Sequence, residues 1–333
     1  MKSCAEIFGL LGERLASFGE DAASRHAIRC AMESNEWFSE CDIRHALRAI
    51  CCEMLDREKV EAWLQRYPTP TPQPLNVGII MAGNIPLVGF ADLQCVIASG
   101  NTPYIKPSSK DEALMRYVVE LLREIEPALR IEYLDASTPL DALIATGGES
   151  ANLYFRSTYK GTPSLLRGSR HSVAVLTGEE GLEELERLAD DVFTYSGLGC
   201  RSVSLIFVPR GMSLALPRRA MCRAYHNNYL QTRALLTMQG RAFDDLGEAV
   251  AVRGEATFPS RLSCINIAEY DSTEEVAAWL AAHDDELQCV VSRLPLHSRT
   301  VAIGQAQQPT LTDYADECDT MAWLNTLRVG ETA

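Results

Sequence analysis

From residue 75 onward, short and almost wholly apolar runs alternate with segments in which apolar residues recur every three or four positions. The first apolar run covers 75–82, and its composition predicts a strand buried on both faces. A helical pattern over 86–99 and a second strand over 102–106 follow it. Such alternation is typical of parallel strands joined by helices in right-handed crossovers. The chain is therefore predicted to be an α/β protein.

The alternation continues to the end of the chain. Further strands are predicted at 131–134, 142–146, 172–176, 201–208, 264–267, 288–292 and 300–303. Further helices are predicted at 111–125, 182–194, around 216–229 and at 320–327. Residues 1–66 show only helical spacing, and a proline-rich connector from Pro68 to Pro74 joins them to the first strand. We expect two parallel-sheet α/β domains with a cleft between them.

The acidic balance of the chain restricts its partners. It carries 45 acidic and 31 basic residues, a net charge of −14, which argues against non-specific binding to nucleic acid or anionic membranes. Its eleven cysteines include no Cys-x-x-Cys pair and lie mostly in apolar patterns. That usage predicts a reduced, cytoplasmic protein without a disulfide framework. No spacing of histidines and cysteines supports a metal site.

Neither a signal peptide nor a membrane span is expected. Glu6 and Glu13 interrupt the segment that would have to be the apolar core of a signal peptide. The longest uncharged stretch, 67–91, contains five prolines and so cannot form one uninterrupted helix.

The segment from Met81 to Pro86, Met-Ala-Gly-Asn-Ile-Pro, joins the first predicted strand to a turn. Asn84 should lie at the carboxyl end of that strand, where open parallel sheets bind ligands. Its amide can donate a hydrogen bond to negative charge that develops on a carbonyl oxygen. The alternative is that Asn84 only caps a helix that begins at Pro86.

Two further turns follow strands and could hold an anionic ligand. Lys106 ends the second strand, where it could meet ribose hydroxyls or a phosphate ahead of the next helix N-terminus, or could be an exposed lysine before a helix cap. Thr146-Gly147-Gly148 follows the fourth strand, and its glycines would let the backbone approach a pyrophosphate. The Gly-x-Gly-x-x-Gly fingerprint is absent.

Positive charge gathers between Ser150 and Gly178. This stretch holds four cations and no acid, which fits an anionic ligand or a solvated loop. The cations are Arg156, Lys160, Arg167 and Arg170.

Cys200 follows two glycines, in Gly197-Leu-Gly-Cys200 at the head of a strand. The glycines leave room for a substrate to approach the sulfur and for the Cys200 N–H to point at a bound oxygen. A thiolate is a competent nucleophile, and a neighbouring cation such as Arg201 would favour it. The alternative is a small residue in a tight turn.

Together these segments resemble the aldehyde dehydrogenase superfamily, and more closely its acyl-CoA reductase (LuxC-type) branch. The superfamily has an Asn-x-Pro turn, then Gly-Asn-Thr, a strand and Lys-Pro. Here these are Asn84-Ile-Pro86, Gly100-Asn-Thr102 and Lys106-Pro107. The phosphate turn of the superfamily is matched by Thr146-Gly147-Gly148 and its nucleophile by Cys200. The similarity extends over about residues 75–327, including the tail after Gly304.

The resemblance implies an aldehyde dehydrogenase-like fold with the active site between two domains. It assigns 75–171 to a Rossmann-like nucleotide-binding domain and 172–297 to a catalytic domain that carries the nucleophile. It also implies that 1–74 packs on the nucleotide domain and that 298–333 returns to it.

The chain departs from the dehydrogenase pattern at two points. The glutamate that activates the hydrolytic water is absent from the matching segment Arg167-Gly-Ser-Arg170. A second glutamate, which contacts the nicotinamide ribose, is absent from Phe258-Pro-Ser-Arg261. The first loss suits a reductase, because an acyl-enzyme that is to be reduced should not be hydrolysed. The second leaves the positioning of the nicotinamide without an explanation.

By resemblance, Cys200 attacks an acyl-CoA thioester, and Asn84 with the Cys200 N–H stabilises the oxyanion. Hydride from a nicotinamide then releases the aldehyde. Lys106 would hold the adenosine ribose, and the uncharged Ser108 and Ser109 would tolerate a 2′-phosphate, which favours NADPH over NADH. His171 protonates the product or caps a strand. No metal is required.

The first hypothesis is thus a fatty acyl-CoA reductase. A reductase of acyl phosphates, or of a short or aromatic acyl-CoA, is the alternative among enzymes. A catalytically inactive nucleotide-binding homologue is the alternative of another class. By analogy with the branch, we expect a homodimer or a higher homo-oligomer.

Overall fold

The computed structural model describes residues 2–68 and 73–327, which fold into two compact units. Unit 1 contains the chain up to residue 169 and from 309 onward, and unit 2 contains 170–308. Part of the proline-rich connector, residues 69–72, lies outside the described residues. Within the described residues, none of the helices combines the length and apolar character needed to cross a bilayer.

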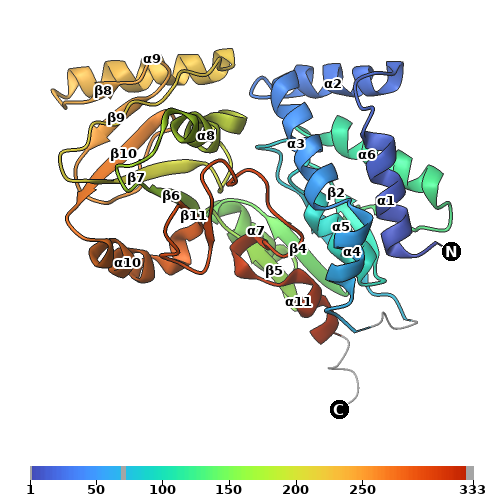
Figure 1. Cartoon of the computed structure of the whole chain (residues 1–333). Helices are drawn as coiled ribbons and strands as arrows, with labels where there is room; N and C mark the ends of the chain where they lie inside the picture. The colour runs from blue at the N-terminus through green and yellow to red at the C-terminus, as the bar shows by residue number, and fades with distance from the viewer. Residues whose placement is uncertain (1, 69–72, 328–333) are drawn as a thin grey trace. The chain divides into compact units, whose positions relative to one another are not determined.

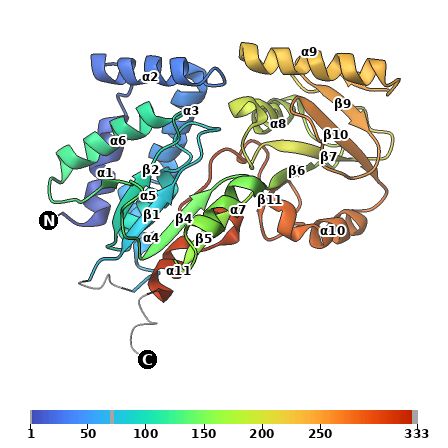
Figure 2. The ribbon, with the colours of Figure 1, turned by 180° about the vertical axis from the view of Figure 1, so that it is seen from behind.

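Four helices precede the first strand. They are α1 (Cys4–Leu15), α2 (Ala22–Ser34), α3 (Glu40–Glu53) and α4 (Arg57–Leu64). The residue before each helix caps it, because its side chain accepts a hydrogen bond from a backbone N–H of the first turn. The four caps are Ser3, Asp21, Ser39 and Asp56. Their apolar faces join the core of the first sheet, and α1 and α2 pack beside α6 (Figures 1 and 2).

The first sheet has the order β3-β2-β1-β4-β5, and its neighbouring strands are parallel. Its strands are β1 (Asn76–Ile80), β2 (Thr102–Lys106), β3 (Glu132–Tyr133), β4 (Ala142–Thr146) and β5 (Ser164–Arg167). The connecting helices are α5 (Phe90–Ala98), α6 (Glu112–Ile125) and α7 (Glu149–Thr158). The returning helix α11 (Thr320–Thr326) packs on α5. The strand order reverses between β1 and β4, which is where such sheets bind ligands.

The second sheet has the order β12-β11-β6-β7-β10-β9-β8 and is parallel except for the pair β8–β9. Its strands are β6 (His171–Val175), β7 (Val203–Pro209), β8 (Asp244–Asp245), β9 (Val250–Arg253), β10 (Cys264–Tyr270), β11 (Leu287–Ser292) and β12 (Thr300–Val301). The helices are α8 (Leu182–Phe193), α9 (Arg223–Met238) and α10 (Thr273–Ala282). In Figure 1, α8 and α9 lie on one face of this sheet and α10 on the other.

The fold class predicted from the sequence is confirmed, and several element limits are corrected. The helix expected from 86 begins only at Phe90, because Leu87 adopts φ 57° in the turn that precedes it. The helix expected around 216–229 is α9, which begins at Arg223. The strands β5, β8 and β9 and the helix α10 were not predicted.

The boundaries between the two units differ from the predicted domain boundaries. Unit 2 begins at 170 and ends at 308, whereas the sequence predicted 172–297 for the second domain. The later end has a physical reason, since β12 pairs with β11 and so belongs to the second sheet. The roles assigned to the domains stay predictions.

Candidate functional site

The carboxyl ends of β1, β2 and β4 meet at one edge of the first sheet. The register pairs Ile80 with Lys106 on one side and with Ala145 on the other. Because the strands are parallel neighbours, the segments that follow them emerge side by side. The residues of unit 1 that were predicted to bind the nucleotide or to donate the oxyanion amide lie in these segments. These residues are Asn84, Lys106, Ser108, Ser109, Thr146, Gly147 and Gly148.

Asn84 is exposed in the turn after β1, and buried contacts hold both sides of this turn. The Gly83 carbonyl accepts a hydrogen bond from buried Asn35 Nδ2 at 3.1 Å. On the other side, the Leu87 N–H donates to Asp111 Oδ2 at 2.8 Å. Helix α5 has Gly89 as its N-cap, so Asn84 does not cap it and that alternative is wrong.

Asp111, the N-cap residue of α6, accepts the hydrogen bond that holds this turn at Leu87. Its side chain is buried, and its Oδ1 has no hydrogen-bond partner among the described residues. Burial raises the pKa of Asp111 well above its ordinary value, although the Leu87 N–H opposes that shift. Sequence reasoning missed Asp111, because an acid before a helix is usually a solvent-exposed cap.

The turns after β1 and β2 are in contact at Gly83 and Ser108. A Cβ on Gly83 would lie 2.4 Å from Ser108 Oγ, so only glycine fits without a shift. Ser109 and the side chain of Lys106 are exposed, and no hydrogen bond or ion pair to the Lys106 ammonium exists among the described residues. Lys106 is thus an exposed cation at this edge of the sheet that is available to an anionic ligand.

The third turn opens the backbone to a ligand. The Gly147 N–H donates to the Arg167 carbonyl at 3.2 Å, and Gly148 is the N-cap of α7. A Cβ on Gly148 would meet nothing within 4 Å, whereas one on Gly147 would lie 2.8 Å from Ala151 Cβ. The open space at Gly148 and the helix N-terminus behind it suit a phosphate.

Arg167 begins the segment that the resemblance matches to the one holding the water-activating glutamate of the dehydrogenases, and it is buried at the end of β5. Its Nη1 lies 2.5 and 2.6 Å from the two carboxylate oxygens of Asp92, and its Nη2 donates to Thr320 Oγ1 at 2.6 Å. The guanidinium therefore ties β5 to α5 and α11. It is engaged internally, so the reading of Arg167 as a contact for an anionic ligand is wrong.

Cys200 lies in unit 2, between a distorted turn (Thr194–Gly197) and β7. It is half-buried and forms no disulfide with any described residue. The turn before it is left-handed at Tyr195 (φ 56°), Ser196 (φ 55°) and Gly197 (φ 65°). Ser172 Oγ donates to the Cys200 carbonyl at 2.8 Å, which fixes Cys200 at the amino end of β6.

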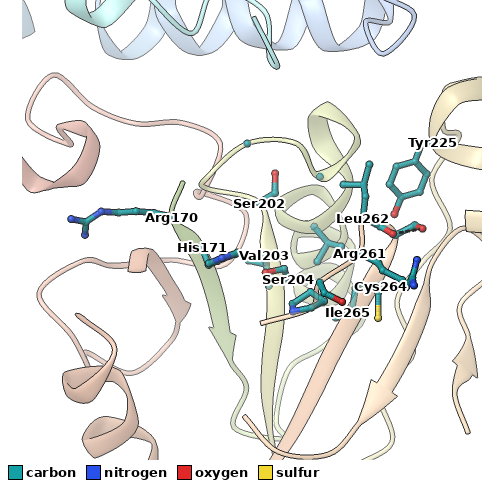
Figure 3. Close-up of a pocket in the computed structure, with 16 residues that line it drawn as sticks. Arg170, His171, Ser202, Val203, Ser204, Tyr225, Arg261, Leu262, Cys264 and Ile265 are labelled. Atoms are coloured by element: carbon teal, nitrogen blue, oxygen red, sulfur yellow. Dashed lines mark hydrogen bonds between the residues drawn. The ribbon is translucent and has the colours of Figure 1, made fainter. Parts of the chain in front are cut away.

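A pocket of about 200 Å³ opens beside the turn that precedes Cys200 (Figure 3). It is lined by Gly197 and Gly199, which precede Cys200, by the first residues of β6, β7 and β10, and by 259–263. Cys200 itself is not among its lining residues. In Figure 3, Arg170 extends away from the other labelled side chains, and it donates to the Leu287 carbonyl at 3.0 Å.

His171 lines the same pocket as the first residue of β6. Its ring stacks on Phe258, with centroids 4.2 Å apart and planes 13° from parallel. Burial lowers the pKa of His171, and the nearby Glu286 opposes that shift, so the neutral imidazole is favoured. Its role in protonating the product stays a prediction.

The structure therefore brings together the predicted residues of unit 1 at one sheet edge, whereas Cys200 lies in unit 2 and directly follows Gly199, a residue that lines the pocket. The pairing of Cys200 with Asn84 across the two units stays a prediction. No group of three or more His, Cys, Asp or Glu in residues 2–68 and 73–327 is arranged to hold a metal ion.

Comparison with known proteins gives a family and a fold. The family model for acyl-CoA reductase (LuxC) matches residues 37–329. The solved structure of an NAD-dependent aldehyde dehydrogenase from Sinorhizobium meliloti is 15% identical, with TM-score 0.61, and the match covers 89% of this chain and 72% of that one. No curated protein matches the chain.

Two further solved structures have the same fold. Aldehyde dehydrogenase 21 from Physcomitrella patens, in complex with its reaction product succinate, is 11% identical with TM-score 0.64, and covers 92% of this chain and 79% of its own. An NAD-dependent benzaldehyde dehydrogenase from Corynebacterium glutamicum is 14% identical with TM-score 0.60, and covers 87% and 76%. At these identities the likeness establishes an aldehyde dehydrogenase-like fold.

Proposed function

The chain belongs to the acyl-CoA reductase (LuxC) family, and we propose that it reduces an acyl-CoA thioester to the aldehyde through an acyl-enzyme on Cys200. The observation that carries this proposal is the setting of Cys200. It is half-buried, and Gly197 and Gly199, which precede it, line a pocket. A nucleophile needs both a substrate-sized space and access to the sulfur.

Several other cysteines are poorer candidates, because burial disfavours their thiolates. Cys95 and Cys289 are buried, and desolvation raises the pKa of Cys95 above its ordinary value. Desolvation also raises the pKa of Cys264, and that of Cys51 to about 11. The thiolate is the reactive form, so these residues fit packing roles.

The residues of unit 1 fit a pyridine nucleotide. Lys106 would hold the adenosine ribose, and Thr146, Gly147 and the open backbone at Gly148 would hold the pyrophosphate. Neither Ser108 nor Ser109 carries a charge, so a 2′-phosphate is tolerated and NADPH is the favoured nucleotide. When bound, the nicotinamide supplies hydride to the acyl carbon.

The chain's own residues would act before and after that transfer. The Cys200 sulfur attacks the thioester carbon, and the coenzyme A thiolate leaves. The Asn84 amide and the Cys200 N–H donate to the oxyanion that forms in this step. Once the acyl carbon is reduced, the thiohemiacetal collapses, which releases the aldehyde and regenerates Cys200.

The position of the dehydrogenase base supports reduction over hydrolysis. Arg167 has no proton-accepting atom, and its guanidinium is engaged by Asp92 and Thr320. No base at this position would activate water against the thioester. We therefore expect aldehyde, not carboxylic acid, as the product.

The test is coenzyme A release from purified protein, with Cys200→Ala as the variant and Cys264→Ala as its matched control. Cys264 lines the pocket that Gly197 and Gly199 also line, so the control removes a thiol at this pocket and leaves Cys200 in place. We expect release to be lost in Cys200→Ala and kept in Cys264→Ala. Release from Cys200→Ala at the wild-type rate would overturn the assignment, and no release from wild type would favour an inactive homologue.

A second experiment decides the acyl group and the nucleotide. Oxidation of NADPH and of NADH is followed over acyl-CoA substrates from acetyl to myristoyl, with an aromatic acyl-CoA and an acyl phosphate included. A fatty acyl-CoA reductase prefers the long chains. Preference for a short chain, an aromatic acyl group or an acyl phosphate would select the alternatives. Light scattering of the same preparation tests the expected homodimer or higher homo-oligomer.

A further inference from the structure

The two residues that follow Cys200 are tied to one loop, residues 304–307, which we call the clasp loop. Arg201 Nε donates to the Ala306 carbonyl at 2.5 Å. Gln307 Nε2 donates to Ser202 Oγ at 3.4 Å. These two hydrogen bonds anchor the segment between Cys200 and the start of β7 to the clasp loop. The orientation of Cys200 therefore depends on where the clasp loop lies.

The clasp loop is held in turn by Asp191, a residue of α8. Asp191 Oδ2 accepts from the Gly304 N–H at 2.6 Å, and Oδ1 accepts from the Ala306 N–H at 2.9 Å. Its backbone carbonyl accepts from Gln307 Nε2 at 3.3 Å. Since α8 runs directly into the turn before Cys200, one residue braces the nucleophile segment from both sides.

Burial of the Asp191 carboxylate costs the folded state free energy. Asp191 is 1% exposed, and burial raises its pKa to about 7, with Asp190 adding to that shift. The N–H groups of Gly304 and Ala306 oppose it, as does Arg201. A buried carboxylate is weak evidence for a stabilising role, because desolvation offsets much of what its hydrogen bonds contribute. An account of Asp191 in terms of stability alone is therefore poor.

We propose that Asp191 is a positioning residue for the nucleophile: its carboxylate fixes the clasp loop, and the clasp loop fixes Arg201 and Ser202 and so the Cys200 sulfur. This inference rests on the proposed role of Cys200. Small displacements of a reacting atom are expensive, and a shift of about 1 Å can cost about 100-fold in rate. Asp191 itself does not touch the substrate in this scheme.

The test compares Asp191→Asn with Asp190→Asn as the matched control. Both substitutions remove one negative charge from the same helix, but Asp190 is exposed and pairs with Arg219 at 2.8 Å. Asparagine keeps the shape and can accept only one of the two N–H bonds. We expect single-turnover acylation of Asp191→Asn to slow by about 10- to 100-fold with little change in KM for acyl-CoA. Asp190→Asn should acylate as wild type does.

Thermal unfolding separates positioning from structure. Asp191→Asn no longer buries a charge, so its unfolding temperature at pH 8 should not fall. A variant that lost acylation and unfolding temperature together would make Asp191 structural and overturn the proposal. Acylation of Asp191→Asn at the wild-type rate would overturn it as well.

A second variant approaches the clasp loop from the nucleophile side. Arg201→Lys keeps the charge but removes the planar Nε–H that reaches Ala306. If Asp191 and Arg201 act through one loop, Asp191→Asn/Arg201→Lys should be no slower than the slower single variant. Independent effects, which would multiply in the double variant, would contradict the proposed route. Peptide mass analysis of acylated wild type keeps the two proposals distinct, because an adduct on Cys200 upholds the proposed function whatever Asp191 does.

Discussion

Replacing Arg167 by methionine should destabilise unit 1 by about 3–5 kcal/mol, because the substitution leaves the Asp92 carboxylate buried without its partner. The side chains of Arg167 and Asp92 are only 6% and 8% exposed. Both Asp92 oxygens lie within 2.6 Å of Arg167 Nη1. The variant also removes the donor to Thr320, through which β5 holds the returning helix α11.

An exposed ion pair of similar geometry provides the control. Arg210 Nε and Nη2 donate to the two Asp271 oxygens at 2.6 and 2.7 Å, but the side chains are 65% and 64% exposed. Arg210→Met should therefore cost no more than about 1 kcal/mol. The double variant Arg167→Met/Asp92→Leu should recover most of the loss, because it replaces the buried pair by apolar side chains.

The assay is urea unfolding followed by tryptophan fluorescence and by far-UV circular dichroism, which also reports on unit 2, the unit that contains Arg210. Of the four tryptophans, Trp37, Trp63 and Trp323 lie in unit 1 and Trp279 lies in unit 2, so the fluorescence reports mainly on unit 1. With a slope of about 2 kcal/mol per M urea, the loss in Arg167→Met would lower the midpoint by about 2 M. A midpoint shift in Arg167→Met no larger than that in Arg210→Met would refute the reasoning.

Three further predictions concern the edge of the first sheet. Gly83→Ala should weaken NADPH binding in a titration, because its Cβ would lie 2.4 Å from Ser108 Oγ, whereas Gly181→Ala, with nothing within 4 Å, should bind as wild type does. Ser108→Glu should shift the ratio of kcat/KM values from NADPH toward NADH, because a carboxylate repels a 2′-phosphate; an unchanged ratio would place the 2′-position elsewhere. Burial raises the pKa of Asp111, so its contribution to stability is greatest below the unfolded pKa and is lost as pH rises through the folded pKa. Asp111→Asn should thus gain unfolding temperature relative to wild type at pH 8 compared with pH 4, and an equal difference at both pH values would contradict this.

Strand and turn positions were predictable where local signals agree with the fold. The apolar runs that became β1, β2 and β4 are buried on both faces, so their composition predicted them directly. Because parallel strands end at one edge, their order along the chain was enough to group Asn84, Lys106 and Gly148. The family followed from the spacing of the same motifs.

The features that the sequence did not predict share one cause: they depend on contacts with residues far along the chain. Helix α5 begins at Phe90 and not at Pro86, because Leu87 adopts a left-handed conformation that a hydrogen bond to the Asp111 side chain holds. The local sequence contains no signal for this conformation. The roles of Asp111 and Asp191 depend on burial by residues far along the chain, and an acid in a helical pattern reads as solvent-exposed. Arg167 was read as part of a cationic stretch because its partners, Asp92 and Thr320, are 75 and 153 residues away.

The most direct test of the account is to find which residue acyl-CoA modifies. Wild-type protein is mixed with acyl-CoA in the absence of nucleotide, and the reaction is quenched in acid. The protein is then digested, and the masses of its peptides are measured. The account predicts one acyl group on the peptide that contains Cys200, which disappears when NADPH is added as aldehyde forms. An adduct on another of the eleven cysteines, or coenzyme A released with no adduct at all, would contradict it.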